Sequence, residues 1–240
     1  MHTRGENIFM RLPTLLALVS LSQFAAPPSA IAGPVIYEWA LNIDGTLHDY
    51  FSPGPLPPGV AADLGFTAHT TGLGSISVTV TGAGAHSVTG FFDHEIDEPI
   101  NTFFNEFGAV TGVAPAGQHW EIDEPGYVFG NIFANLILGL LDNTNGVPAG
   151  SPDDVSMGLG WNFLLGAGQT ANIHFLVDSV APAGGFYLTH TDPDSGSSIF
   201  LSGGLNIVGG DVPEPASYVL LATGVACIAL ARRYRKSRSL

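Results

Sequence analysis

Hydrophobic and polar positions alternate in several short stretches of the chain, which predicts β-strands with one buried face. The clearest case is the stretch 154–165. Its apolar positions are Val155, Met157, Leu159, Trp161 and Phe163, and its other face carries Ser156, Gly158, Gly160 and Asn162. The stretches 75–81 and 171–177 repeat the alternation. We expect each of these strands to bury one face and to expose the other.

Other short runs of β-favouring residues lie between Gly, Pro, Asn and Asp turns. They span 35–43, 64–70, 87–93, 117–122, 185–190, 199–201 and 205–208. One segment, 131–141, instead places Ile132, Phe133, Leu136, Ile137, Leu140 and Leu141 on one helical face and predicts a short helix. The pattern predicts an all-β fold, a single β-sandwich or jelly-roll-like ectodomain over residues 33–210.

Residues 1–32 have the pattern of a signal peptide. Arg4 and Arg11 supply positive charge, and a short apolar stretch follows them. Ala30, Ile31 and Ala32 form a small-residue cleavage site before Gly33. We expect cleavage after Ala32. The alternative is an uncleaved anchor helix, which the short apolar stretch disfavours.

The C-terminal segment 211–240 carries three features in order. The motif Val212, Pro213, Glu214 and Pro215 precedes an apolar stretch at 216–231. A basic segment at 232–238 follows, with Arg232, Arg233, Arg235 and Lys236. A helix over 216–231 reaches about 24 Å, close to the roughly 30 Å of a hydrocarbon core, so one transmembrane helix is predicted. The basic cluster predicts a cytoplasmic end and a domain outside the cytoplasmic membrane.

This order of Pro-Glu-Pro, one short helix and an arginine-rich end resembles the PEP-CTERM sorting signal of Gram-negative bacteria. The resemblance implies that an exosortase, a membrane transpeptidase-like enzyme, removes the tail near Pro213 to Pro215. It also implies transient anchoring in the inner membrane, followed by release to the cell surface or beyond. The stretches 101–106, 120–125, 141–146 and 152–156 resemble other ectodomains of this family, a likeness that implies no particular activity. The alternative is a permanent single-pass anchor after a proline hinge.

Charge is distributed very unevenly along the chain. All seven basic residues lie near the two ends, and none lies between Gly33 and Val212. Of the 21 acidic residues, only Glu6 and Glu214 lie outside that stretch. A surface without cations cannot neutralise phosphates, so nucleic-acid binding is excluded as a function. The carboxylates must be solvated, hydrogen-bonded, or neutralised by protons or metal ions.

A five-residue motif occurs twice, as Glu95-Ile96-Asp97-Glu98-Pro99 and as Glu121-Ile122-Asp123-Glu124-Pro125. If the two copies lie side by side, their six carboxylates converge with two imidazoles. These residues are Glu95, Asp97, Glu98, Glu121, Asp123 and Glu124, with His94 and His119. Oxygen ligands without competing cations suit Ca²⁺. Two alternatives stay open: paired carboxylates for glycoside hydrolysis, and strand ends with acids in water and Ile in the core.

The sequence shows no nucleophile elbow, P-loop or catalytic cysteine, and its histidines lack zinc-site spacing. We therefore expect a non-catalytic protein. The resemblance to PEP-CTERM proteins implies a surface or matrix component associated with exopolysaccharide, and the carboxylates make calcium a candidate bridging ion. The competing interpretation is a secreted carbohydrate-active hydrolase that uses the paired carboxylates.

Overall fold

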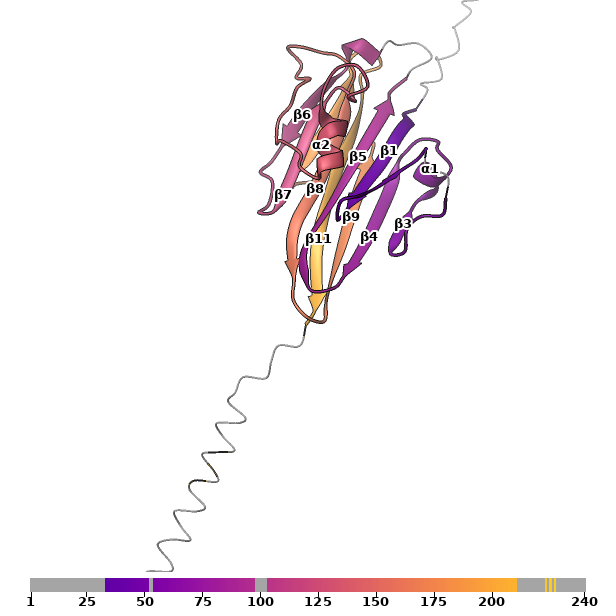
Figure 1. Cartoon of the computed structure of the whole chain (residues 1–240). Coiled ribbons are helices and arrows are strands. Elements are labelled where there is room, and N and C mark those ends of the chain that lie inside the picture. The colour runs from indigo at the N-terminus through magenta and orange to yellow at the C-terminus, as the bar shows by residue number, and fades with distance from the viewer. Residues whose placement is uncertain are drawn as a thin grey trace, which may run out of the picture. The chain divides into compact units, whose positions relative to one another are not determined.

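The computed structural model describes residues 33–51, 54–97 and 103–210, together with Thr223, Val225 and Cys227. It contains two β-sheets, shown in Figure 1. The first sheet has the strand order β2 (Thr46–Asp49), β1 (Val35–Ile43), β5 (Gly84–Glu95), β8 (Ser156–Leu165) and β7 (Gln118–Asp123). The second has the order β3 (Val60–Ala62), β4 (Gly74–Thr81), β9 (Gln169–Asp178), β11 (Ser197–Gly209), β10 (Tyr187–Asp192) and β6 (Phe107–Thr111). Neighbouring strands are antiparallel throughout, which confirms the predicted all-β sandwich.

The main core lies between the two sheets and follows the predicted alternation. Ile76, Val78 and Val80 of β4 are buried, while the residues between them are exposed. Phe175 of β9 packs against Phe92 and Trp161 from the first sheet. Large side chains from both sheets therefore meet in one layer, where their burial stabilises the fold by about 1.5–3 kcal/mol each.

Helix α2 (Ile132–Leu138) covers the outer face of the first sheet, as Figure 1 shows. Ile132 and Leu136 pack with Ala40, Phe91 and Leu141 in a second, smaller core. The side chain of Asn42 donates hydrogen bonds to the carbonyl oxygens of Leu136 and Ile137 at the end of the helix. The last carbonyls of a helix lack partners further along it, so Asn42 supplies a donor to Ile137, adds to the Gly139 amide at Leu136, and joins the helix to β1. The predicted helix is confirmed in this shorter form.

The helix corrects the prediction that β8 exposes one face. Ser156, Gly158 and Gly160 are all buried. Gly158 lies under Ile132 of α2 and Leu141, whereas Gly160 lies against His119 and Thr89 of the neighbouring strands. A Cβ at Gly158 would lie 2.9 Å from Leu141 Cδ1, closer than real Cβ atoms approach. The small residues therefore allow a helical layer to pack closely on the sheet, and they do not mark a solvent-facing surface.

The prediction of a strand over 64–70 is wrong. The segment forms a one-turn helix, α1 (Leu64–Thr67), in which Phe66 is buried and Leu64 is 79% exposed. Apolar residues alternate there in the sequence, but only Phe66 enters the core, where it contacts Trp39. The alternation of apolar residues at 64–70 therefore does not correspond to the buried face of a strand.

Some strands differ in number or length from the prediction. Three short strands were not predicted: β2, β3 and β6. The runs at 199–201 and 205–208 belong to one continuous strand, β11, because its pairing with β9 continues through Ser202, Gly203 and Gly204. A short 3₁₀ turn, η1 (Phe103–Asn105), precedes β6.

The two ends of the chain fall largely outside the described residues. The predicted signal peptide at 1–32, with Ala30 and Ala32, and the motif at 212–215 lie there, as does most of the predicted helix at 216–231. Within the part of the chain that the structure describes, no helix is long and apolar enough to cross a membrane.

Candidate functional site

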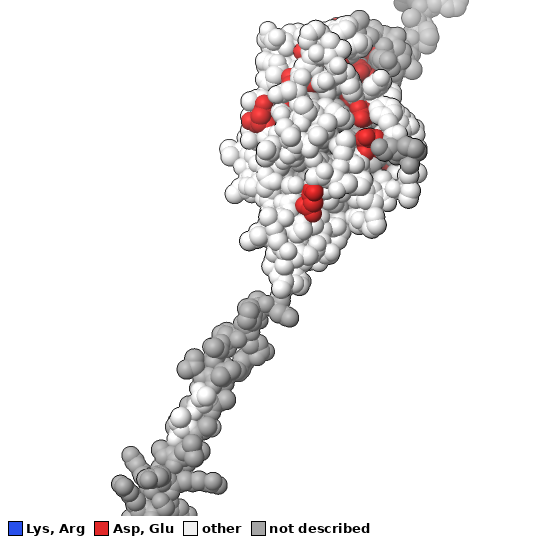
Figure 2. Space-filling model, in the orientation of Figure 1, with Lys and Arg blue, Asp and Glu red and all other residues white. Residues whose placement is uncertain are grey.

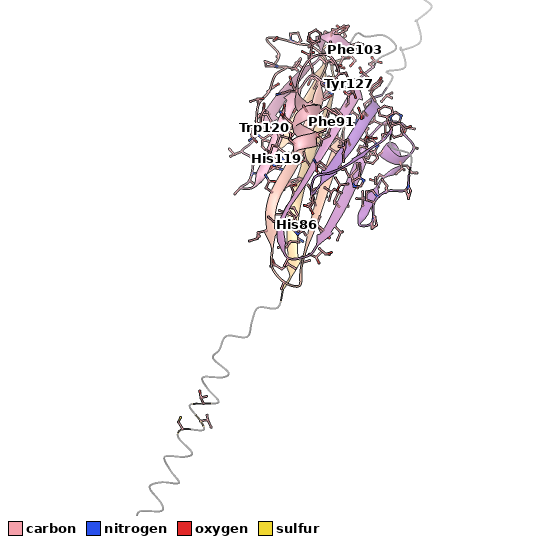
Figure 3. All side chains as sticks on the ribbon, in the orientation of Figure 1. His86, Phe91, Phe103, His119, Trp120 and Tyr127 are labelled. Carbon is pink, nitrogen blue, oxygen red and sulfur yellow. The ribbon has the colours of Figure 1, made fainter. Side chains whose placement is uncertain are left out.

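A pocket of about 460 Å³ opens at one end of the sandwich. Strand pairing shows which end this is. At the pocket end, Asp93 near the end of β5 pairs with Ser156 at the start of β8; at the other end, Gly84 pairs with Leu165. Strand β11 also finishes at that other end, because Gly209 pairs with Gln169, just after the turn from β8. Figure 3 shows Phe103 and Tyr127 at the pocket end and His86 at the other.

Exposed aromatic side chains form much of the pocket wall. They are Tyr37, Phe103, Phe104, Tyr127 and Phe129, each between 37% and 69% exposed. Tyr37 lies at a register shift between Ile36 and Glu38 of β1, a bulge that adds a residue at the strand edge. Its ring lies edge-on to Tyr127, with centroids 6.4 Å apart. Such exposed rings provide flat apolar surface for a ligand.

Five carboxylates line the same pocket: Asp93, Glu95, Glu124, Asp153 and Asp154. Asp93 and Glu95 are two residues apart on β5 and so point to the same face of the sheet. Asp93 lies between Glu38 of β1 and Ser156 of β8, its partners on the two neighbouring strands. The hydroxyl of Ser156 donates a hydrogen bond of 2.8 Å to Asp93 Oδ1.

Burial and nearby carboxylates raise the pKa values of three of these acids, Asp93, Glu124 and Asp154. Burial, followed by the nearby Asp154 carboxylate, raises the pKa of Asp93 well above its ordinary value. Burial and the neighbouring Glu106 raise the pKa of Asp154 to about 7. The Oδ1 atom of Asp154 is buried without a hydrogen-bond partner, which disfavours the charged form further. The pocket therefore holds two carboxyl groups, Asp93 and Asp154, whose charged form is disfavoured.

A hydroxyl group bridges the aromatic and acidic parts of the wall. Tyr127 donates a hydrogen bond to Glu38, a buried acid of β1. Burial raises the pKa of Glu38, and Tyr127 opposes that rise by hydrogen-bonding the carboxylate. The contact fixes the Tyr127 ring at the pocket.

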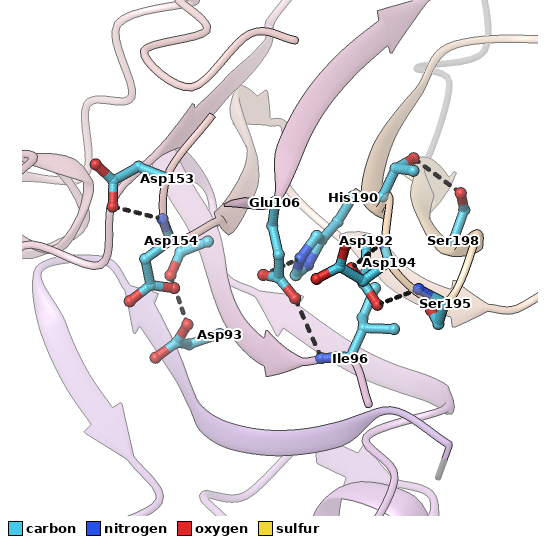
Figure 4. Close-up of polar contacts among 12 residues, drawn as sticks. Asp93, Ile96, Glu106, Asp153, Asp154, His190, Asp192, Asp194, Ser195 and Ser198 are labelled. Atoms are coloured by element: carbon cyan, nitrogen blue, oxygen red, sulfur yellow. Dashed lines mark hydrogen bonds and ion pairs between the residues drawn. The ribbon is translucent and has the colours of Figure 1, made fainter. Parts of the chain in front are cut away.

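A buried pair, Glu106 and His190, lies behind the pocket (Figure 4). Glu106 Oε2 is 2.5 Å from His190 Nε2, and Glu106 Oε1 accepts a hydrogen bond from the Ile96 amide. Burial raises the pKa of Glu106 to about 9 and lowers that of His190 to about 3. Burial thus disfavours the charged form of each group, and the contact between them holds both side chains in place.

The two copies of the five-residue motif contribute differently to this site. Glu95 from the first copy and Glu124 from the second line the pocket together. Glu121 is fully buried, where it accepts hydrogen bonds from the Asn135 amide and the Asp142 backbone. Asp123 accepts a hydrogen bond from the Asn131 backbone just before α2.

The other two acids of the predicted carboxylate cluster do not line the pocket in the described part of the chain. Asp97 is buried in a left-handed backbone conformation, and Glu98 lies outside the described residues. Among residues 33–51, 54–97 and 103–210, no group of three or more His, Cys, Asp or Glu side chains is arranged to hold a metal ion. The calcium site therefore stays a prediction without a described set of ligands.

The two predicted imidazoles are buried in separate places. His94 lies against the Gly72 carbonyl oxygen, and His119 lies 3.0 Å from the Thr89 hydroxyl. Burial lowers the pKa of His94 to about 3 and that of His119 to about 4, so both rings are neutral at pH 7. Neither ring lines the pocket.

Most pocket residues were not predicted from the sequence. Tyr37, Asp93, Phe103, Tyr127 and Asp154 come from five separated segments, so no local spacing connects them. The one sequence feature that pointed to the pocket was composition: aromatic and acidic residues occur close together in a segment that has no Lys or Arg.

Comparison with known protein families identifies the C-terminal segment. Residues 211–236 match the PEP-CTERM protein-sorting motif, which confirms the predicted resemblance. The chain thus carries the signal of an exosortase-processed, exported protein directed to the cell surface. No curated protein and no solved structure shows a significant match to it.

Proposed function

We propose that the mature protein is a non-catalytic surface component that binds polysaccharide through the pocket at the end of the sandwich. The observation that carries this proposal is the combination of exposed aromatic rings and carboxylates around one cavity. Rings stack against the apolar faces of sugars, while carboxylates accept hydrogen bonds from their hydroxyl groups. The pocket thus offers both kinds of contact that a sugar chain requires.

The position of the pocket supports this proposal. The sorting motif begins at residue 211, directly after β11 ends at Gly209, whereas the pocket opens at the opposite end of the sandwich. A protein held through its C-terminal segment therefore presents the pocket away from its point of attachment. An extended polymer can reach such a site without passing the rest of the domain.

A labelled glycan screen with the mature protein, with and without EDTA, tests the proposal. We expect binding without release of shorter products, and Phe104→Ala should weaken it about tenfold by removing a stacking surface. Leu164→Ala is the matched control, because Leu164 is also exposed but lies near the other end of β8. Loss of binding in EDTA supports the calcium-assisted form. An absence of glycan binding would reject the proposed function.

The second candidate is a carbohydrate-active hydrolase. One observation favours it: the pKa of Asp154 is raised to about 7 in a pocket that also holds Asp153 and Glu124. A protonated carboxyl beside ionised carboxylates is the pairing that glycoside hydrolysis requires. Product release that persists in EDTA and disappears in Asp154→Asn would favour this candidate over the binding protein.

A further inference from the structure

We propose that the pocket selects a protonated amine carried on a sugar ring, that is, a polysaccharide stretch whose hexosamine units lack N-acetyl groups. The proposal rests on the proposed function, because it names the class of sugar that the same pocket binds. It follows from two features of the wall, its negative charge without Lys or Arg and its exposed aromatic surface.

The charge of the pocket has no basic counterpart in the domain. Five carboxylates line it, and the sequence from 33 to 210 contains no Lys or Arg. Acidic side chains are seen on an otherwise uncharged surface in Figure 2. The neighbouring His94 does not compensate either, because burial lowers its pKa to about 3. A cationic ligand therefore gains attraction here, whereas an acidic sugar is repelled.

The aromatic lining distinguishes between kinds of cation. A hydrated metal ion uses oxygen ligands and gains little from the rings of Phe103, Phe104 and Phe129. An ammonium group on an apolar frame can contact the carboxylates and the ring faces together. A neutral sugar can stack on the rings but leaves the carboxylates without a positive partner. The wall is therefore complementary to a ring-shaped molecule that carries a positive charge.

Several pocket acids are suited to contact an amine. Glu124 and Asp153 are only partly buried at the pocket, so a ligand can reach them from solvent. Asp93 is 1% exposed and already accepts a hydrogen bond from Ser156. We therefore assign the ligand contact to Glu124 and Asp153, while Asp93 stays engaged with Ser156 inside the wall.

Isothermal titration of the mature protein with four matched ligands tests this inference. The ligands are a β-1,4-linked glucosamine tetramer, its fully N-acetylated counterpart, cellotetraose and tetralysine, each at a pH where the free amine is protonated. We expect the glucosamine tetramer to bind at least about tenfold more tightly than the other three, and added salt to reduce that advantage. Glu124→Gln and Asp153→Asn should remove most of the preference, whereas Phe104→Ala should weaken all three sugars. Unfolding curves check that each variant folds.

The outcomes separate this inference from the proposed function. If the acetylated or neutral tetramer binds as tightly as the glucosamine tetramer, the selection for an amine is wrong while glycan binding stands. If tetralysine binds as tightly, the pocket recognises cationic peptides and the sugar assignment is overturned. If none of the sugars binds, both the preference for an amine and the proposed function are wrong.

Discussion

The two copies of the Glu-Ile-Asp-Glu-Pro motif have identical residues but different surroundings in the folded chain. In the first copy, Glu95 ends β5 and lines the open pocket. In the second, Glu121 lies within β7 and is fully buried, with hydrogen bonds from Asn135 and Asp142. The isoleucines, Ile96 and Ile122, are buried in both copies. Thus the apolar position keeps one role, whereas the role of the acid depends on whether α2 covers it.

The largest expected effect concerns the position that the two copies share. Ile96→Ala and Ile122→Ala should each lower the free energy of unfolding by about 2–5 kcal/mol, because each removes buried methyl groups from the main core. Urea unfolding measures the loss. Val113→Ala is the control, since Val113 is 89% exposed and its change should stay within about 0.5 kcal/mol. A loss of stability in only one of the two variants would show that the two isoleucines do not have the same role in the core.

The next effect separates the two glutamates. Glu121→Ala should destabilise the protein by about 1–3 kcal/mol, because it leaves the Asn135 amide and the Asp142 backbone amide without their acceptor. Glu95→Ala, at the pocket, should change stability by about 0.5 kcal/mol or less. The same urea series compares them. Equal losses would contradict the distinction between a covered and an open acid.

The pH dependence of stability sharpens the comparison. Burial raises the pKa of Glu121 to about 7, so its contribution to stability is fully present below about pH 4.5 and is lost as pH rises through 7. Glu121→Gln should flatten this decline by up to about 3 kcal/mol in unfolding measured from pH 4.5 to 8. If the free energy of unfolding changed with pH in the same way in both proteins, the protonation of Glu121 would not be coupled to folding.

Other buried groups add to the wild-type profile. Glu106 and Asp154 also have raised pKa values and act in the same direction as Glu121. His94, His119 and His190 have lowered pKa values, so their contribution is present above about pH 6.5 and is lost as pH falls toward 4 and 3. Their opposing effect is common to wild type and Glu121→Gln, which makes the difference between the two curves the informative quantity.

The sequence pattern predicted the parts of the fold in which burial alternates. The strand at 35–43 was predicted with the bounds of β1, and β4, β8 and β9 follow their predicted stretches closely. Strand β6 was missed because it is short and contains glycine. Its Gly108 packs against Ile122, a contact between distant segments that no local pattern shows.

The candidate site was less predictable for a related reason. The motif repeat supplied Glu95 and Glu124, whereas Glu121 of the same repeat is buried and does not line the pocket, and Glu98 lies outside the described residues. The difference arises from α2, which covers Glu121, and from the strand pairing that brings Asp93 beside Ser156. Such contacts depend on the assembled sheets, so residue spacing alone could not separate the pocket acids from the buried ones.

The smallest effect tests the helix that distinguishes the two copies. Gly139 caps the C-terminal end of helix α2, and its φ of 67° lies in the left-handed region that glycine adopts without strain. A methyl group there has room, with no atom closer than 3.8 Å, so Gly139→Ala should cost only the backbone strain of about 1 kcal/mol. Gly150→Ala is the matched control, because Gly150 has no positive φ and no neighbour within 4 Å. In Gly139→Ala, amide hydrogen exchange should become faster in α2 and at the Asp142 amide that bonds Glu121, and remain unchanged in β4. Equally faster exchange in all three places would mean that α2 does not open independently of the rest of the fold.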